Sequence, residues 1–145
     1  MAKKFFRSVE EMMDYVEKAI AEVLWTEVSD YIIHRLQESV QENVYDVYLP
    51  HRYIRREHNH GLIDERNFED NLKISKSIVL EIHNVTEKAF DDKDNRTLAE
   101  IIEYGIPNGE QPWEIPRPFI QPIIDELMSS DIVEEILKDN LDFLF

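Results

Sequence analysis

The chain has 145 residues, no cysteine and a formal net charge of −15 at pH 7. This length is typical of one domain, and we expect a single domain over residues 1–145. The lack of cysteine excludes disulfides, thiolate zinc sites and a cysteine nucleophile. No run reaches the ~20 apolar residues of a membrane span, and acidic residues interrupt the N-terminus before a signal peptide could form. We therefore expect a protein of the cytoplasm, or of a particle assembled there.

The negative charge is concentrated in the second half. Residues 1–80 carry 11 Lys and Arg against 15 Asp and Glu, whereas residues 81–145 carry 5 against 16. Such a surface argues against nucleic-acid binding, which needs Lys and Arg to displace counterions from phosphates. Two interpretations remain: a solvated acidic face that keeps the protein in solution, or a face that meets a basic partner or lines a channel through which DNA slides without binding.

The N-terminus predicts a short arm followed by a long helix. Residues 1–7 place three positive charges around Phe5 and Phe6, which suits either an arm that orders against a partner or a frayed end. Ser8 and Glu11 form a capping box that starts the helix at Val9. Apolar residues then recur at helical spacing to about residue 42, without glycine or proline.

A helix of that length does not fit inside a domain of this size. It would span about 50 Å at 1.5 Å per residue, whereas the domain would be about 25 Å across. We therefore expect the helix either to kink near Trp25–Thr26 or to protrude, and a protruding end would need a partner.

Three arginines, Arg52, Arg55 and Arg56, form the densest positive cluster. Salt bridges to nearby Glu57, Asp64, Glu65 and the acidic C-terminal half would account for them, because planar guanidinium groups suit carboxylates. The alternative is a contact between subunits of a ring.

The histidines offer only a weak case for a metal site. His58 and His60 could share a metal with Glu57 or Asp64, since alternate residues of a strand lie on one face. Exposed loop histidines are the simpler interpretation. We expect no metal, no cofactor and no catalytic residues, because no phosphate-binding glycine loop or serine triad is present either.

Residues 72–86 carry the strongest strand pattern, with apolar residues on one face and charged residues mostly opposite. Residues 52–56 and 66–72 are the expected partners in a small antiparallel sheet. Thr97 and Glu100 form a second capping box, which launches a short helix ending at Gly105.

A proline-rich crossover follows this helix and organises the C-terminal part. Prolines at 107, 112 and 116 bar regular structure, with Trp113 as an apolar anchor. Pro118 is expected to begin a new helix, since proline lacks only an N–H that the first turn does not use. Asp131 and Glu134 would cap a last helix over roughly 132–141. The apolar end at 141–145, including Phe143 and Phe145, would dock on its own domain or on a neighbour.

Two segments resemble a known family. The pattern EYG, then W, then PRPFI and a helix, within Ile101 to Met128, resembles the C-terminal half of the tail-completion proteins of long-tailed bacteriophages, the lambda Z type. Val44 to Asn71 resembles the middle of that family, where a run of the form Y-P-x-x-Y-x-R-R precedes a Gly-Leu-Ile/Leu-Asp turn and an Asn. One departure is His60, which stands where the family favours glycine.

The resemblance implies a structural role at the head–tail junction and no enzyme activity. It implies a homo-oligomeric ring that links the connector or stopper to the tail terminator or tube, in the virion neck, with DNA passing through the lumen without specific binding and no membrane contact. The alternatives are an acidic adaptor or inhibitor of the DNA-mimic type that binds a basic host protein, and a metal-dependent hydrolase. We expect an α+β fold, with a long N-terminal helix packed on a small antiparallel sheet and C-terminal helices. The expected interface residues are Phe5, Phe6, Arg52, Arg55, Arg56, Trp113, Arg117, Phe119, Phe143 and Phe145.

Overall fold

A long helical rod runs through the molecule in the computed structural model, which describes residues 5–47, 55–88, 95–106 and 115–142. The rod comprises α1 (Val9–Val23), a π-helical turn η1 (Leu24–Val28), α2 (Ser29–Val40) and a second π-helical turn η2 (Gln41–Tyr45). Ser8 accepts a hydrogen bond from the Glu11 N–H at 3.1 Å, which confirms the predicted N-cap. The predicted irregularity near Trp25 is the turn η1, so the expected long helix is present and is locally unwound where a kink was expected.

The sheet is a two-stranded antiparallel hairpin of β1 (Phe68–Ile74) and β2 (Ile78–Asn84). The prediction of one continuous strand over 72–86 is wrong, because the chain turns back at Ser75–Lys76–Ser77, where the Ser75 N–H donates to the Ser77 carbonyl. Leu72 lies opposite Leu80 and Ile74 opposite Ile78. The expected apolar face therefore exists, but two strands share it. Residues 68–72 are part of the partner strand, as expected. Of the other expected partner, 52–56, residues 55 and 56 are not in a strand, and residues 52–54 lie outside the described part.

Three short helices complete the fold: α3 (Leu98–Tyr104), α4 (Gln121–Ser129) and α5 (Ile132–Leu141). Thr97 caps α3 as predicted, accepting from the Glu100 N–H at 3.2 Å. Gly105 ends α3 with a φ of 73°, a left-handed conformation that glycine adopts without strain. The new helix begins at Gln121 rather than at Pro118, with Pro122 in its first turn. The bounds of α5 match the prediction, although Asp131 makes no side-chain cap.

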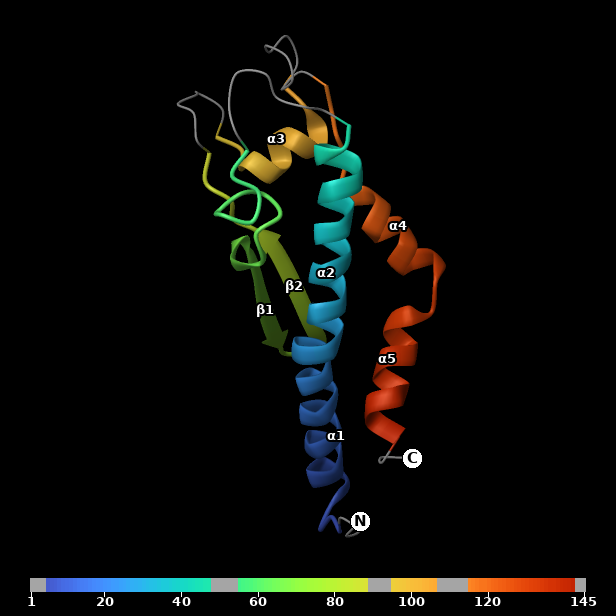
Figure 1. Ribbon diagram of the computed structural model, residues 1–145. Coiled ribbons are helices and arrows are strands. Elements are labelled where there is room, and N and C mark those ends of the chain that lie inside the picture. Colours follow the sequence, from blue (N-terminus) through green and yellow to red (C-terminus); the bar gives the residue numbers. More distant parts are fainter. Residues whose placement is uncertain (1–4, 48–54, 89–94, 107–114, 143–145) are drawn as a thin grey trace.

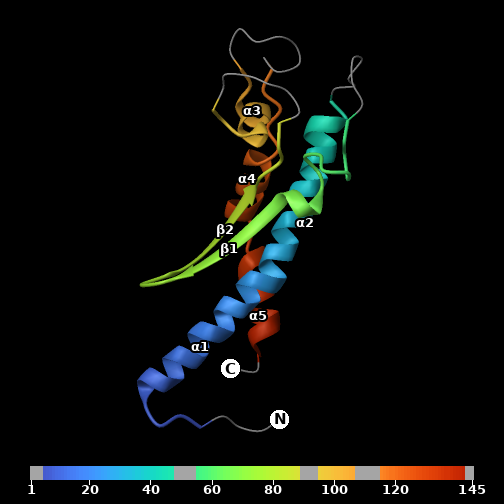
Figure 2. The same cartoon turned by 90° about the vertical axis from the view of Figure 1, so that its left-hand side faces the viewer.

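These elements are arranged around the long rod (Figures 1 and 2). The hairpin lies on one side of the rod in Figure 1, α4 and α5 descend along the other side, and α3 lies near the upper end. This is the α+β architecture that the sequence predicts. Among the described residues, no helix is both long and apolar enough to cross a membrane.

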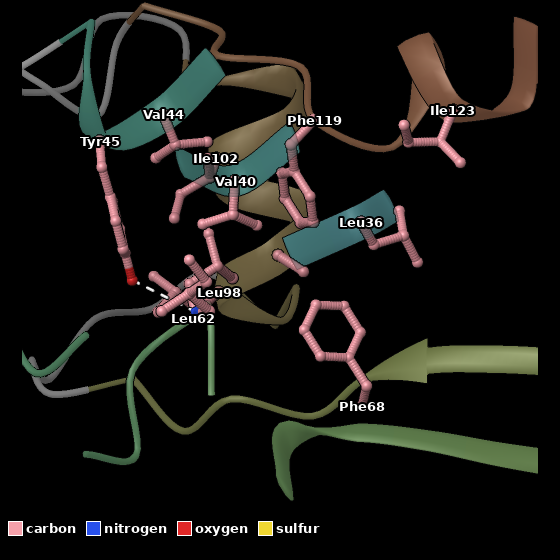
Figure 3. Packing of buried hydrophobic residues seen from close by; sticks show 12 residues of the cluster. Leu36, Val40, Val44, Tyr45, Leu62, Phe68, Leu98, Ile102, Phe119 and Ile123 are labelled. Atoms are coloured by element: carbon pink, nitrogen blue, oxygen red, sulfur yellow. Dashed lines mark hydrogen bonds between the residues drawn. The ribbon is translucent and has the colours of Figure 1, made fainter. Parts of the chain in front are cut away.

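The apolar side chains gather in two clusters. The larger one joins the upper half of the rod to the hairpin base, α3 and α4, with Val40, Phe119 and Phe68 among its buried members (Figure 3). The smaller one joins the lower half of the rod to α5 through Val23, Val28 and Leu141. Ser29 ties the rod to the hairpin, because its hydroxyl donates to the Asp70 carboxylate at 2.6 Å.

A buried carboxylate holds the start of α4. Glu103, on α3, accepts hydrogen bonds from the N–H groups of Phe119, Ile120 and Gln121 at 2.8, 2.9 and 2.9 Å. The first N–H groups of a helix have no acceptor within the helix, and Ile120 at the N-cap position provides none. Glu103 therefore supplies the cap for α4 from another helix, and its negative charge lies at the positive end of the α4 dipole.

Two further hydrogen bonds fix the same segment. The Arg117 N–H donates to the Ile102 carbonyl at 2.8 Å, and the Ser39 hydroxyl donates to the Phe119 carbonyl at 2.6 Å. The segment that leads into α4 is thus bonded to both α3 and α2.

Replacing Glu103 should destabilise the whole fold. We expect Glu103→Ala to lower the free energy of unfolding by about 3–5 kcal/mol, because one buried and two partly buried N–H groups lose a charged acceptor. Glu103→Gln, which keeps one acceptor oxygen, should cost less, about 2 kcal/mol. Urea denaturation followed by circular dichroism measures both values. The exposed Glu42→Gln is the matched control and should stay within about 0.5 kcal/mol of the native protein. A loss below 1 kcal/mol for Glu103→Ala would contradict the capping role.

Candidate assembly interface

The loop before the hairpin is organised by the carboxylate of Asp64. Asp64 is buried and accepts from the backbone N–H groups of His60 and Arg66, at 2.7 and 2.9 Å. The Arg66 guanidinium donates to the same carboxylate at 2.6 Å. These hydrogen bonds, above all those from the Arg66 side chain, hold the pKa of Asp64 well below its usual range. The Asp64 carboxylate therefore links the backbone of the loop at residue 60 to the backbone at residue 66.

The backbone of this loop explains the departure at residue 60. His60 has a φ of 66°, in the left-handed region that favours glycine, the residue that the resemblance leads one to expect at this position. Gly61 follows, and a Cβ at this position would collide with the backbone of Glu57. The loop thus keeps a left-handed turn with a histidine, while the tight approach at Gly61 needs the absence of a side chain.

The arginine cluster bonds to backbone carbonyls of its own chain. Arg55 donates to the Tyr45 carbonyl at 2.8 Å, and its guanidinium lies 4.7 Å from the centre of the Tyr45 ring. Arg56 donates to the Glu87 carbonyl at 2.6 Å. Among the ion pairs of the described residues, Asp64 pairs with Arg66. Arg52 lies outside the described residues, so a contact between subunits at the cluster stays a prediction.

Burial accompanies these contacts on the rod side. Tyr45 is buried, and burial raises the pKa of its phenol above the ordinary value. Its hydroxyl accepts from the Ile63 N–H at 3.3 Å (Figure 3). Arg55 therefore lies between the end of the rod and the loop, where it supports the fold of one chain.

Two of the predicted interface residues belong to the core instead. Phe119 is fully buried against the rod and α3, and Arg117 is buried beside it. Neither side chain is exposed for contact with a neighbouring chain, so these two predictions are corrected. The segment PRPFI directs its aromatic residue into the monomer because the Glu103 and Ser39 bonds hold the backbone against α3 and α2. Trp113 lies outside the described residues.

The N-terminal end, in contrast, exposes apolar side chains. Phe5 is 82% exposed, and Phe6 contacts the Tyr15 ring at a centroid distance of 5.3 Å. Val9 and Met13, in the first turns of α1, are 68% and 62% exposed. At the other end, Leu141 is buried, and Phe143 and Phe145 lie outside the described residues. We call Phe5, Val9, Met12 and Met13 the α1 patch.

The histidines and carboxylates do not gather into a metal site. Within the described ranges, no group of three His, Asp or Glu residues is placed to hold a metal ion. His58 and His60 are exposed on the loop. The His60 backbone N–H, not its ring, makes the contact to Asp64.

Sequence reasoning missed Glu103 and the Asp64–Arg66 pair. The signal for Glu103 was indirect: a helix that starts in a proline-rich segment, without Ser, Thr, Asp or Asn before it, needs a cap from elsewhere. The signal for Asp64 was local, because an Asp side chain often accepts a hydrogen bond from the backbone N–H two residues later and so closes a turn.

Removing the Asp64 charge should weaken the fold at neutral pH and alter its acid unfolding. Because the folded-state pKa is lowered, the stabilisation is present above the unfolded pKa of about 4 and is lost as the pH falls through the folded value. We expect Asp64→Asn to lower the urea midpoint at pH 7, with a smaller difference from the native protein below pH ~4. Glu65→Gln, an exposed neighbour, is the control. An equal difference at both pH values would contradict the role of the charge.

Comparison with known proteins identifies the family of this chain. The family model of the YomN family matches residues 8–142, from the cap of α1 to the end of α5. Comparison with curated proteins and with solved structures found no match. The match covers both resembling segments, the hairpin and the long rod, so the chain belongs to the YomN family.

Proposed function

We propose that this protein is a structural component of a phage particle, a tail-completion or neck protein at the head–tail junction. In this proposal, identical copies form a ring that links the connector or stopper to the tail terminator or tube. The proposal is supported by the resemblance of Val44 to Asn71 and Ile101 to Met128 to that family. The structural observation that carries it is the α1 patch.

The α1 patch continues an apolar stripe that the chain covers only in part. Farther along the rod, α5 packs on Ala19, Ile20 and Leu24 of the same helix. The first turns of α1 lead away from α5, as Figure 2 shows, and leave Val9 and Met13 exposed. Burial of one such side chain contributes about 1.5–3 kcal/mol. Several buried side chains would therefore stabilise the contact with a neighbouring chain that covers the patch.

The rigid part of the molecule suits this assembly role. Glu103 and Ser39 hold α4 and the rod in one arrangement, so exposed surfaces at the ends of the molecule are presented at fixed positions. The negative charge of residues 81–145 would suit a lumen that passes DNA without binding it. Of the alternatives, the hydrolase gains no support from the described histidines, and the acidic adaptor rests on net charge alone.

Mass photometry tests the proposal on the purified protein, alone and mixed with purified products of its neighbouring genes. We expect a ring of defined mass in at least one mixture. Met13→Asp should abolish the ring, because it places a charge in the α1 patch, while circular dichroism stays unchanged. Asn59→Asp, an exposed residue of the loop, is the control with the same charge change.

A native protein that forms no species larger than a dimer, and joins no tail or connector protein, would contradict the proposal. Ring formation by Met13→Asp would remove the α1 patch from the interface.

A further inference from the structure

The hairpin presents a free backbone edge along β1. The Val85 N–H donates to the Asn67 carbonyl at 2.8 Å, and the Ser75 N–H donates to the Ser77 carbonyl at 3.0 Å. In an antiparallel ladder, hydrogen-bonded and non-bonded pairs alternate. These two bonds therefore make the odd-numbered residues of β1 the ones bonded to β2. The N–H and C=O groups of Asp70, Leu72 and Ile74 consequently point away from β2.

This edge lacks several of the features that commonly protect an edge strand, although it carries the charged side chains of Glu69, Asp70 and Lys73. The register of β1 against β2 is unbroken by a bulge, and neither strand contains proline or glycine. β1 is the outer strand of the hairpin in Figure 1 and faces the viewer in Figure 2. The rod contacts both strands, β1 through η1 and the bond from Ser29 to Asp70, and β2 through α2. No third strand pairs with it within the described part of the chain. The edge is therefore accessible to another strand.

We propose that the edge of β1 binds the same edge of a second copy, antiparallel, about a two-fold axis through Asn71. The two hairpins then form one four-stranded sheet. In this register Asp70 lies opposite Leu72 of the second copy, and both residues direct their backbone groups to the new interface. The register therefore satisfies the alternation of the ladder, which a shift by one residue would break.

The side chains on the exposed face favour the same register. Glu69 lies opposite Lys73 of the second copy, and the two-fold axis repeats this pair. Opposite charges at facing positions stabilise a strand pair, whereas like charges destabilise it. Lys73 already contacts Glu81 on β2 at 2.9 Å, so its ammonium group, with three donors, would bind a carboxylate on each side. Glu69 is exposed and free to take part.

The pair differs from the proposed ring. A two-fold contact is closed and uses the same surface on both copies, whereas a ring needs two different surfaces. The pairing also involves none of the α1 patch. The two proposals can therefore fail independently, and the variant Met13→Asp should leave the pair intact.

Reversing single charges tests the register. Glu69→Lys places Lys opposite Lys73 twice, and Lys73→Glu places Glu opposite Glu69 twice. Each variant alone should dimerise about tenfold more weakly than the native protein. An equal mixture of the two should regain native affinity, because both facing pairs are again of opposite charge. Sedimentation equilibrium measures the three dissociation constants, with circular dichroism as a check on the fold.

A cysteine at the axis gives a second, independent readout, since the chain has no cysteine of its own. Facing residues of a non-bonded pair bring their Cβ atoms within about 4.5–5.5 Å. We therefore expect Asn71→Cys to form a disulfide-linked dimer rapidly on mild oxidation. Val79→Cys, on the same face but on β2, should cross-link far more slowly. Three results would each overturn the proposal. The native protein could show no self-association, the mixture could dimerise no better than its components, or both cysteine variants could cross-link equally fast.

Discussion

The carboxylate of Glu103 is the interaction on which the arrangement of the helices depends. It accepts three backbone N–H groups at the start of α4, where the sequence provides no cap of its own. A buried carboxylate would be costly without such donors, and the N–H groups would be equally costly without an acceptor. The carboxylate and the N–H groups thus offset each other's desolvation cost, and their hydrogen bonds set the position of α4 against α3.

This contact has consequences across the fold. Phe119, held beside it, fills the core between the rod and α3. The Ser39 hydroxyl extends the connection to α2, and the Arg35 guanidinium bonds to Glu126 on α4 at 3.0 Å. With α4 fixed, only Ser130 and Asp131 separate it from α5, which packs on the lower half of the rod. The buried contacts are thus distributed along the rod, and they leave the side chains of its first turns exposed.

The two exposed surfaces differ in chemistry, which suits two different contacts. The α1 patch offers apolar side chains and gains from burial in any complementary groove. The β1 edge offers directional backbone groups and a fixed order of charges, which selects a partner and a register. The two surfaces share no residues, so each proposed contact can be tested separately.

Local signals predicted the parts of the fold that local interactions determine. The caps at Ser8 and Thr97, the end of α3 at Gly105 and the bounds of α5 all follow from residues within one turn of each other. The antiparallel sheet was expected, but the turn at Ser75–Lys76–Ser77 was missed. This turn lacks the glycine or asparagine of common tight turns, and the apolar alternation continues past it.

Other errors have non-local causes. The sequence indicates that an apolar residue in a proline-rich segment is buried, but it does not indicate whether its own chain or a neighbouring chain buries it. Phe119 was therefore assigned to an interface. Its true place depends on Glu103, 16 residues earlier in the sequence.

Amide hydrogen exchange measured by NMR tests the role of Glu103 most directly. The first N–H groups of a helix normally exchange fast, because no carbonyl of the helix accepts them. If Glu103 holds them, the amides of Phe119, Ile120 and Gln121 should be protected to a degree comparable with that of buried Val40 at the end of α2. Exchange of these three amides as fast as that of exposed Lys76, in the turn of the hairpin, would contradict the account.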